Sequence, residues 1–257
     1  MQLNVTDNSI TFGTNILDVH VPDHLRERVK TGMPYLDEVM GGHGFVPTSV
    51  TLFTGEPGAG KSTMLQLAAD SLTRQGHTCV LISGEESPYQ IKMTAERLNL
   101  KNGYVISGET FLPRLLPQLK TLSDAAKAKG KKLAVLFDSL QTLNDGYYHT
   151  KHGYDESYTN SKTPIRSLQM VTEFCKSEHA IGIVIGQVNK SGQMAGANTL
   201  KHMVDAKLHL GIETKDKDLE GCRILECEKN RFGHNGTTCF LKLDDRGFQV
   251  VATVKSI

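Results

Sequence analysis

The sequence predicts an α/β fold with a mostly parallel central sheet flanked by helices, followed by an antiparallel extension of strands at the C-terminal end. Apolar runs alternate with helix-like segments between residues 49 and 187, and this alternation is typical of parallel sheets covered by helices. From about Ala206 the helical patterns stop and strand-like runs follow one another, which favours antiparallel pairing. The 257 residues, 39% of them hydrophobic, suit one large domain with a sizeable core.

The elements of the parallel part follow from apolar runs and from signals at helix ends. We expect apolar strands at residues 49–54, 78–83, 133–138 and 180–187, and a short strand at residues 104–107. We expect helices at residues 61–75, 87–98 and 164–177, and a helical segment between residue 107 and about residue 129. Ser87 and Pro88 are typical of an N-cap and a first helical position. Pro113 and Pro117 should interrupt the helical segment between residues 107 and 129.

The two ends of the chain complete this organisation. We expect the closing strands at residues 206–212, 223–229, 237–243 and 248–251. Residues 1–29 are polar with some strand character, and we interpret them as an arm that can contact a neighbouring subunit. Residues 30–257 then form the core domain.

Charge and hydropathy narrow the class of protein. The 29 basic and 28 acidic side chains leave a net charge of +1, so a nucleic-acid site must be a local patch. The apolar runs are far shorter than the roughly 20 residues that cross a bilayer, and the chain does not start with a basic and then apolar signal. Five cysteines without a CxxC pair argue against a disulfide framework or a zinc ribbon. We therefore expect a cytoplasmic protein without membrane contact.

Residues 55–62 read GEPGAGKS and match the phosphate-loop pattern G-x-x-x-x-G-K-[ST] between an expected strand and an expected helix. The glycines let backbone N–H groups turn toward phosphates, and the helix N-terminus adds partial positive charge. Lys61 should reach the β and γ phosphates, and the Ser62 hydroxyl should bind Mg²⁺. The sequence therefore predicts a site for ATP and Mg²⁺, formed by Gly55, Glu56, Pro57, Gly58, Ala59, Gly60, Lys61, Ser62 and Thr63.

Polar side chains at the ends of three other strands complete the expected site. Asp138 ends a long apolar run, where its carboxylate can bind the metal. Glu85 and Glu86 follow the strand at residues 78–83, and the residues alone do not decide which of them activates water. Gln187 ends the strand at residues 180–187, where its amide can contact the γ phosphate.

Several stretches together resemble the bacterial RadA (Sms) DNA-repair ATPases of the RecA superfamily. Residues 83–98 read SGEESPYQIKMTAERL and are similar to the segment after that family's second strand, and residues 229–233 match its KNRFG motif. The resemblance implies a RecA-like P-loop NTPase core that assembles as a ring or filament on single-stranded DNA, with ATP between subunits. It also implies Glu85 as the catalytic glutamate, with Lys229 and Arg231 reaching the γ phosphate of the neighbouring subunit. Members of that family usually also carry an N-terminal four-cysteine zinc finger and a C-terminal Lon-like domain. Because this sequence shows neither segment, we expect a core-only form.

RecA-like cores bind DNA through two loops near the nucleotide, and the resemblance places them at residues 144–162 and 188–202. The first contains Tyr147, Tyr148, Lys151 and Tyr154, and interleaved aromatic and basic side chains suit base stacking and phosphate contact. The second contains Lys190 and Lys201. A mobile surface loop or a subunit contact stays open as the alternative for the first loop.

The expected function is that of an ATP-dependent, single-stranded-DNA-binding ATPase in recombination, branch migration or DNA repair. Two alternatives stay open. One is a KaiC-like regulatory or signalling ATPase, because KaiC proteins also have paired glutamates after the second strand. The other is a passive single-stranded-DNA-binding recombination mediator that uses ATP only for assembly.

Overall fold

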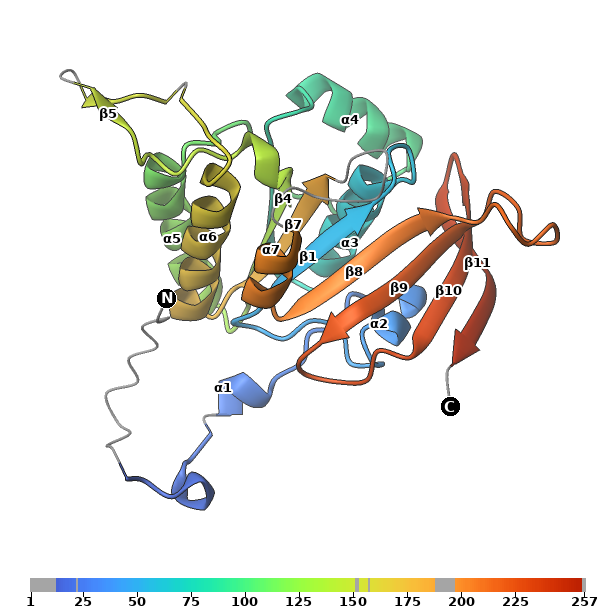
Figure 1. The fold of residues 1–257 in the computed structure, drawn as a ribbon, viewed down its shortest axis with the longest axis horizontal. Coiled ribbons are helices and arrows are strands. Elements are labelled where there is room, and N and C mark those ends of the chain that lie inside the picture. The colour runs from blue at the N-terminus through green and yellow to red at the C-terminus, as the bar shows by residue number, and fades with distance from the viewer. Residues whose placement is uncertain (1–12, 22, 151–152, 157, 188–196, 256–257) are drawn as a thin grey trace.

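A nine-stranded sheet forms the centre of the structure (Figure 1). The computed structural model describes residues 13–21, 23–150, 153–156, 158–187 and 197–255. The strand order is β11-β10-β9-β8-β1-β7-β4-β2-β3, and the neighbours from β8 to β3 are parallel, whereas β8 to β11 pair in antiparallel fashion. The predicted fold class is confirmed. The strands are β1 Val50–Gly55, β2 Thr78–Ser83, β3 Val105–Ser107, β4 Leu133–Asp138, β7 Ile181–Gln187, β8 Ala206–Ile212, β9 Arg223–Asn230, β10 Thr237–Asp244 and β11 Gly247–Lys255.

Helices cover the two faces of the parallel part and bury two separate cores (Figure 1). α3 (Lys61–Arg74) packs on one face of the parallel part, and α2 (Pro34–Val39) extends the same core over β9 and β10. α5 (Leu112–Lys127), α6 (Thr163–Glu178) and α7 (Ala197–Met203) pack on the other face. Adjacent residues of β1 show the alternation, because Phe53 belongs to the first core and Leu52 to the second. Burial on both faces explains why β1, β2, β4 and β7 are nearly continuous apolar runs in the sequence.

The remaining elements are short. They are the 3-10 helices η1 (Ile16–Asp18) and η2 (Leu140–Thr142), the helices α1 (Asp23–Arg26) and α4 (Pro88–Arg97), and a small hairpin of β5 (His149–Thr150) and β6 (Gly153–Tyr154). Helix α4 begins as expected, because Ser87 and Gln90 form a reciprocal capping box and Pro88 opens the helix. None of the helices in the described part of the chain combines the length and the apolarity needed to cross a membrane.

Helix α5 corrects the expectation that two prolines interrupt this segment. Pro113 lies in the first turn, where a missing N–H removes no helical hydrogen bond. Pro117 lies inside the helix on its exposed side, and the helix continues to Lys127 because Leu115 and Leu119 are buried against the sheet. Packing therefore outweighs the local cost of the second proline.

Two further segments differ from the expectation. The described residues of the N-terminal arm form helical turns rather than strands, since the Asn15 side chain accepts a hydrogen bond from Leu17 N at 3.0 Å and caps η1. The last part of the expected second loop is the helix α7, which buries Leu200 and leads into the buried Val204.

Candidate nucleotide site

The phosphate loop lies at the carboxyl edge of the parallel strands, between β1 and α3. Gly55 ends β1 so close to β8 that a Cβ there would lie 2.3 Å from Leu210 O. Gly60 is the N-cap of α3 with φ +106°, and a Cβ there would lie 2.9 Å from both Leu243 and Phe248. A side chain at position 55 would collide with the backbone of β8, and the left-handed backbone at position 60 strains any residue other than glycine, so the local geometry favours glycine at both positions.

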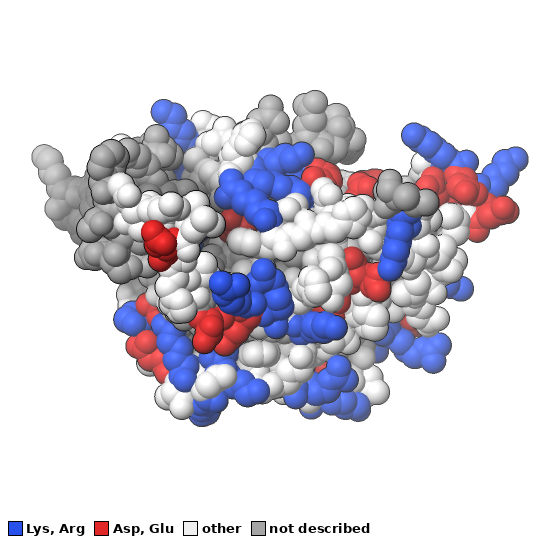
Figure 2. All heavy atoms as spheres, turned by 90° about the horizontal axis from the view of Figure 1, so that it is seen from below, with Lys and Arg blue, Asp and Glu red and all other residues white. Residues whose placement is uncertain are grey.

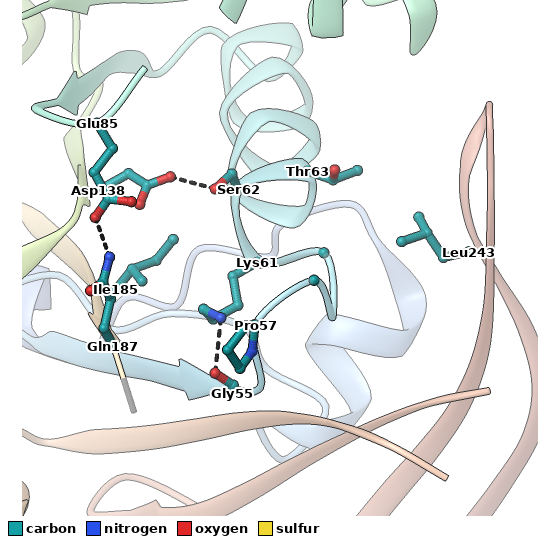
Figure 3. A pocket seen from close by; sticks show the side chains of 12 residues that line it. Gly55, Pro57, Lys61, Ser62, Thr63, Glu85, Asp138, Ile185, Gln187 and Leu243 are labelled. Atoms are coloured by element: carbon teal, nitrogen blue, oxygen red, sulfur yellow. Dashed lines mark hydrogen bonds between the residues drawn. The ribbon is translucent and has the colours of Figure 1, made fainter. Parts of the chain in front are cut away.

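A cavity of about 560 Å³ opens beside this loop. Figure 3 shows the loop and Lys61 in its middle, the acidic side chains and Gln187 at one end, and Leu243 at the other. The strand register explains why these side chains lie at the same edge of the sheet, because Gly55 pairs with Gln187 and Ser83 pairs with Asp138. The lining residues are Gly55, Pro57, Gly58, Gly60, Lys61, Ser62, Thr63, Glu85, Asp138, Ile185, Gln187 and Leu243.

The Lys61 ammonium lies over the mouth of its own loop. Its Nζ donates hydrogen bonds to Gly55 O at 2.9 Å and to Glu56 O at 2.8 Å. Burial lowers the pKa of Lys61, and the charges of Asp138, Glu85 and Glu56 oppose this effect. Because phosphate oxygens are stronger acceptors than carbonyls, the same ammonium can move to a bound phosphate at little rearrangement of the loop.

Ser62 and Asp138 form an oxygen-rich pair on the other side of Lys61. Ser62 Oγ donates to Asp138 Oδ2 at 2.5 Å, and Asp138 is buried at the end of β4. Burial raises the pKa of Asp138, while the Ser62 hydrogen bond and the Lys61 charge oppose the rise. Hydroxyl and carboxylate oxygens are hard ligands, and Mg²⁺ is commonly held by few protein ligands together with phosphates. The donor set therefore fits Mg²⁺.

The structure separates the two glutamates that follow β2. The Glu85 carboxylate points into the cavity, where Oε1 accepts hydrogen bonds from Ser139 Oγ at 2.5 Å and Gln187 Nε2 at 2.6 Å. Glu86 is not among the described residues that line the cavity. Burial, and then the charges of Asp138 and Glu85, raise the pKa of Glu86. Glu85 is therefore the carboxylate that can face a water beside a bound γ phosphate.

Lys229 and Arg231 lie at the opposite end of the sheet from their own phosphate loop. In the register of β8, Leu210 pairs with Gly55, whereas Ala206 pairs with Asn230. Lys229 Nζ donates to Lys201 O at 2.8 Å and Val204 O at 2.7 Å. Burial and the Arg231 and Lys201 charges lower the pKa of Lys229, although Asp205 opposes them. These two cations do not line the cavity of the same chain, a separation expected if they act on another copy.

Arg231 is exposed but anchored at this end of the sheet. Its NH1 lies 3.3 Å from Asp205 Oδ1, and its NH2 donates to His202 O at 3.1 Å. Asp205 is buried and also accepts a hydrogen bond from Val50 N at 3.2 Å, so it ties the start of β1 to the guanidinium. The arginine is therefore presented on a fixed support.

The tyrosines expected at the DNA lie together at the hairpin of β5 and β6. Tyr148 packs on Tyr158 with ring centroids 4.0 Å apart, and Tyr154 packs on Phe111 at 5.2 Å. Tyr147 is 62% exposed, and the Arg166 guanidinium lies 4.2 Å from its ring centroid. The hairpin thus offers exposed aromatic faces with a cation beside one of them.

Lys201 of the second expected DNA loop does not lie beside these tyrosines. Lys201 lies on α7, and its Nζ is 3.9 Å from Glu228 Oε2 beside Lys229, at the other end of the sheet from the phosphate loop. Lys151 and Lys190 lie outside the described residues. The described structure therefore groups Lys201 with the KNRFG cations rather than with the aromatic hairpin.

Sequence reasoning missed three residues of the site. Ser139 contacts Glu85, Ile185 lines the cavity, and Leu243 reaches it from β10. The position of Ser139 directly after Asp138 was an available signal. Leu243 carries no such signal, because only the antiparallel extension brings it beside Gly60.

The chain is similar to two groups of known proteins. Residues 29–254 match the KaiC ATPase family. DNA repair proteins RadA from Aquifex aeolicus and Brucella abortus are 34% and 35% identical over 227 residues, or 88% of this chain. RadA from Listeria monocytogenes is 32% identical over 92% of this chain. These alignments confirm the resemblance to RadA.

The alignments cover 46%, 45% and 48% of those three relatives, so the chain spans about half the length of the curated relatives it matches. Among solved structures, a KaiC-like protein from the hyperthermophilic archaeon Pyrococcus horikoshii has a TM-score of 0.66. It is 17% identical, and the match covers 88% of this chain and 99% of that chain. This second likeness concerns the fold alone.

Proposed function

This chain belongs to the KaiC ATPase family, and on that premise we propose that it binds ATP with Mg²⁺ and hydrolyses it. The observation that carries the proposal is the convergence of Lys61, the Ser62–Asp138 pair and Glu85 on one cavity. Lys61 binds the β and γ phosphates, and Ser62 with Asp138 holds the metal. When bound, Mg²⁺ neutralises charge on the phosphate oxygens.

The chain's own residues then act on the attacking water. Glu85 accepts a proton from that water. At the same time the water oxygen bonds to the γ phosphorus, and the bond from the γ phosphorus to the leaving β-phosphate oxygen breaks. Gln187 and Ser139 hold the Glu85 carboxylate in orientation. Charge accumulates on the phosphoryl oxygens, and Lys61 is the single cation among the described lining residues. The remaining stabilisation comes from Lys229 and Arg231 of a second copy, bound head-to-tail.

Mixing two inactive variants tests this head-to-tail site. Lys61→Ala disables the pocket but keeps the cations, whereas Arg231→Ala keeps the pocket and removes a cation. Each variant alone should be nearly inactive, and a one-to-one mixture should recover up to about a quarter of the wild-type rate, because random mixing joins an intact pocket to an intact neighbour at that share of interfaces. A mixture that co-elutes as an oligomer and yet stays inactive contradicts completion by a second copy.

We further propose that the protein is cytoplasmic, binds single-stranded DNA, and acts in recombination, branch migration or DNA repair. Its RadA relatives are DNA repair proteins, and Tyr147 and Tyr154 are exposed at or beside the β5–β6 hairpin; both observations support this proposal. Stacking on aromatic rings suits single strands, whose bases are not paired. The match to the KaiC family favours a second candidate, a regulatory ATPase that responds to a protein partner. Stimulation of hydrolysis by single-stranded DNA separates the two.

Tyr147 offers the sharpest test of DNA contact. Tyr147→Ala should weaken binding of a fluorescent oligonucleotide by about 5- to 150-fold, because stacking of one base on an aromatic ring contributes roughly 1–3 kcal/mol. Tyr147→Phe keeps the ring and serves as the matched control. Anisotropy should also show wild-type affinity falling steeply with salt. Equal affinities for the two variants, or hydrolysis that ignores DNA at every salt concentration, would favour the regulatory ATPase.

A further inference from the structure

Helix α4 presents its largest apolar side chains to solvent. Tyr89 is 82% exposed and Met93 is 68% exposed, and their spacing of four residues places them on one side of the helix. Of the described residues of α4, Ile91 alone is buried. Aromatic residues and methionine are enriched at the centres of protein interfaces, so this stripe has the composition of a contact surface.

The position of this stripe links it to the nucleotide cavity. Helix α4 begins two residues after Glu86, and Glu85 lines the cavity. Figure 1 shows α4 at the upper end of the molecule, on the side toward which β1 and β7 run. A partner that reaches the γ-phosphate end of the cavity therefore comes close to Tyr89 and Met93.

The opposite end of the sheet carries a complementary surface. Phe232 follows Arg231 directly, is 40% exposed, and lies with its ring centroid 6.0 Å from the Arg28 guanidinium. Lys229 and Lys201 lie at the same end. Figure 2 views the molecule from below and shows Lys and Arg side chains across this face, with Asp and Glu side chains among them. The exposed Phe232 ring thus lies beside several cations at the end of the sheet away from the cavity.

We propose that the Tyr89–Met93 stripe of one copy is the docking site for Phe232 of the next copy. The inference rests on the proposed head-to-tail function, and two observations select a second copy as the occupant. Arg231 and Phe232 are adjacent, so a neighbour that brings Arg231 to the γ phosphate must also bring Phe232 beside the cavity. Glu85 and Glu86 lie just before α4, and their carboxylates complement the Lys229 and Arg231 cations that the neighbour would bring to this end of the cavity.

Removing the stripe should weaken self-association while leaving each pocket intact. Tyr89→Ser with Met93→Ser should raise the protein concentration needed for half-maximal turnover by about tenfold or more, because buried aromatic anchors dominate interface affinity. Binding of a fluorescent ATP analogue to single chains should stay unchanged. Val251→Ser with Val254→Ser is the matched control, since both apolar side chains are about half exposed on the edge strand β11. Unchanged concentration dependence in the double variant overturns the proposal.

Cross-linking tests the contact directly. Tyr89→Cys and Phe232→Cys are combined in a Cys222→Ser background, because Cys222 is half-buried and the other four cysteines are buried. A short bismaleimide should give a ladder of linked oligomers with the combined variant, and dimers alone with a mixture of the two separate variants. Val251→Cys in place of Tyr89→Cys controls for random collision, since Val251 is half exposed on the edge strand β11.

The outcomes separate the inference from the proposed function. If the combined variant stays monomeric on a denaturing gel while the Lys61→Ala and Arg231→Ala mixture recovers activity, the stripe is not the contact and the head-to-tail site stands. If neither experiment succeeds, both proposals are wrong. A ladder that forms equally well with Val251→Cys also overturns the inference.

Discussion

Lys61→Ala is expected to lower ATP turnover by at least about a hundredfold, because it removes a preorganised cation from a partly buried phosphate site. The Lys61 ammonium is held by Gly55 O and Glu56 O at 2.9 Å and 2.8 Å, so it needs only a small movement to reach a bound phosphate. A steady-state phosphate-release assay at saturating ATP and Mg²⁺ measures the effect. The fold should persist, since the side chain is not part of either hydrophobic core.

A lysine far from the cavity provides the control for this variant. Lys129 is exposed after the end of α5, and Lys129→Ala should hydrolyse ATP at the wild-type rate. Thermal melting of both variants checks that they are folded. If the Lys61→Ala protein is folded and its turnover is unchanged, the phosphate loop does not take part in catalysis and the proposed ATPase function is wrong.

Glu85→Gln is expected to reduce kcat by about 10²- to 10⁴-fold, because the amide cannot accept the proton of the attacking water. Binding of ATP should be retained, since the substitution removes a negative charge and keeps the shape of the side chain. Single-turnover hydrolysis together with a fluorescent-nucleotide titration separates the two effects. Similar losses in affinity and in rate would mean that Glu85 binds substrate rather than activates water.

Glu86→Gln is the matched control, because it makes the same chemical change one residue away. Turnover should stay within a few fold of wild type, as Glu86 does not belong to the described lining of the cavity. Its stability should not fall at neutral pH. Folding raises the pKa of the Glu86 carboxyl, so its ionisation destabilises the folded state as pH rises from the unfolded-state pKa through the folded-state pKa. A glutamine does not ionise and lacks this destabilisation. A large loss of kcat in Glu86→Gln alone would exchange the roles of the two residues.

The sequence predicted the strands of the parallel part well, since burial on both faces leaves long apolar runs between turns. It also predicted the residues around the phosphate loop, because residues at strand ends meet at one edge of a parallel sheet. It could not choose between Glu85 and Glu86, since both follow the same strand and only the turn after Ser83 decides which one points inward. Helix α7 and the unbroken α5 depend on packing against the second core, which local residue preferences do not encode.

The place of Lys201 shows a further limit. Counting from Gln187 groups it with a loop at the nucleotide edge, but α7 returns the chain across the sheet before β8 begins. Residues close in sequence are thereby separated by the full height of the sheet. A loop assignment made from spacing alone has no means of detecting such a return.

The register of β8 has a consequence for how the protein behaves in dilute solution. Ala206 and Leu210 are four residues apart along this strand, or about 13 Å, and the paired strands keep that separation rigid. In a single molecule the loop at residues 55–62 and Arg231 therefore lie at opposite ends of the sheet, and rotation of their side chains does not bring them to the same phosphate group. A reaction that needs both groups requires association of at least two molecules. Its rate per molecule should therefore fall on dilution and recover when the protein is concentrated again.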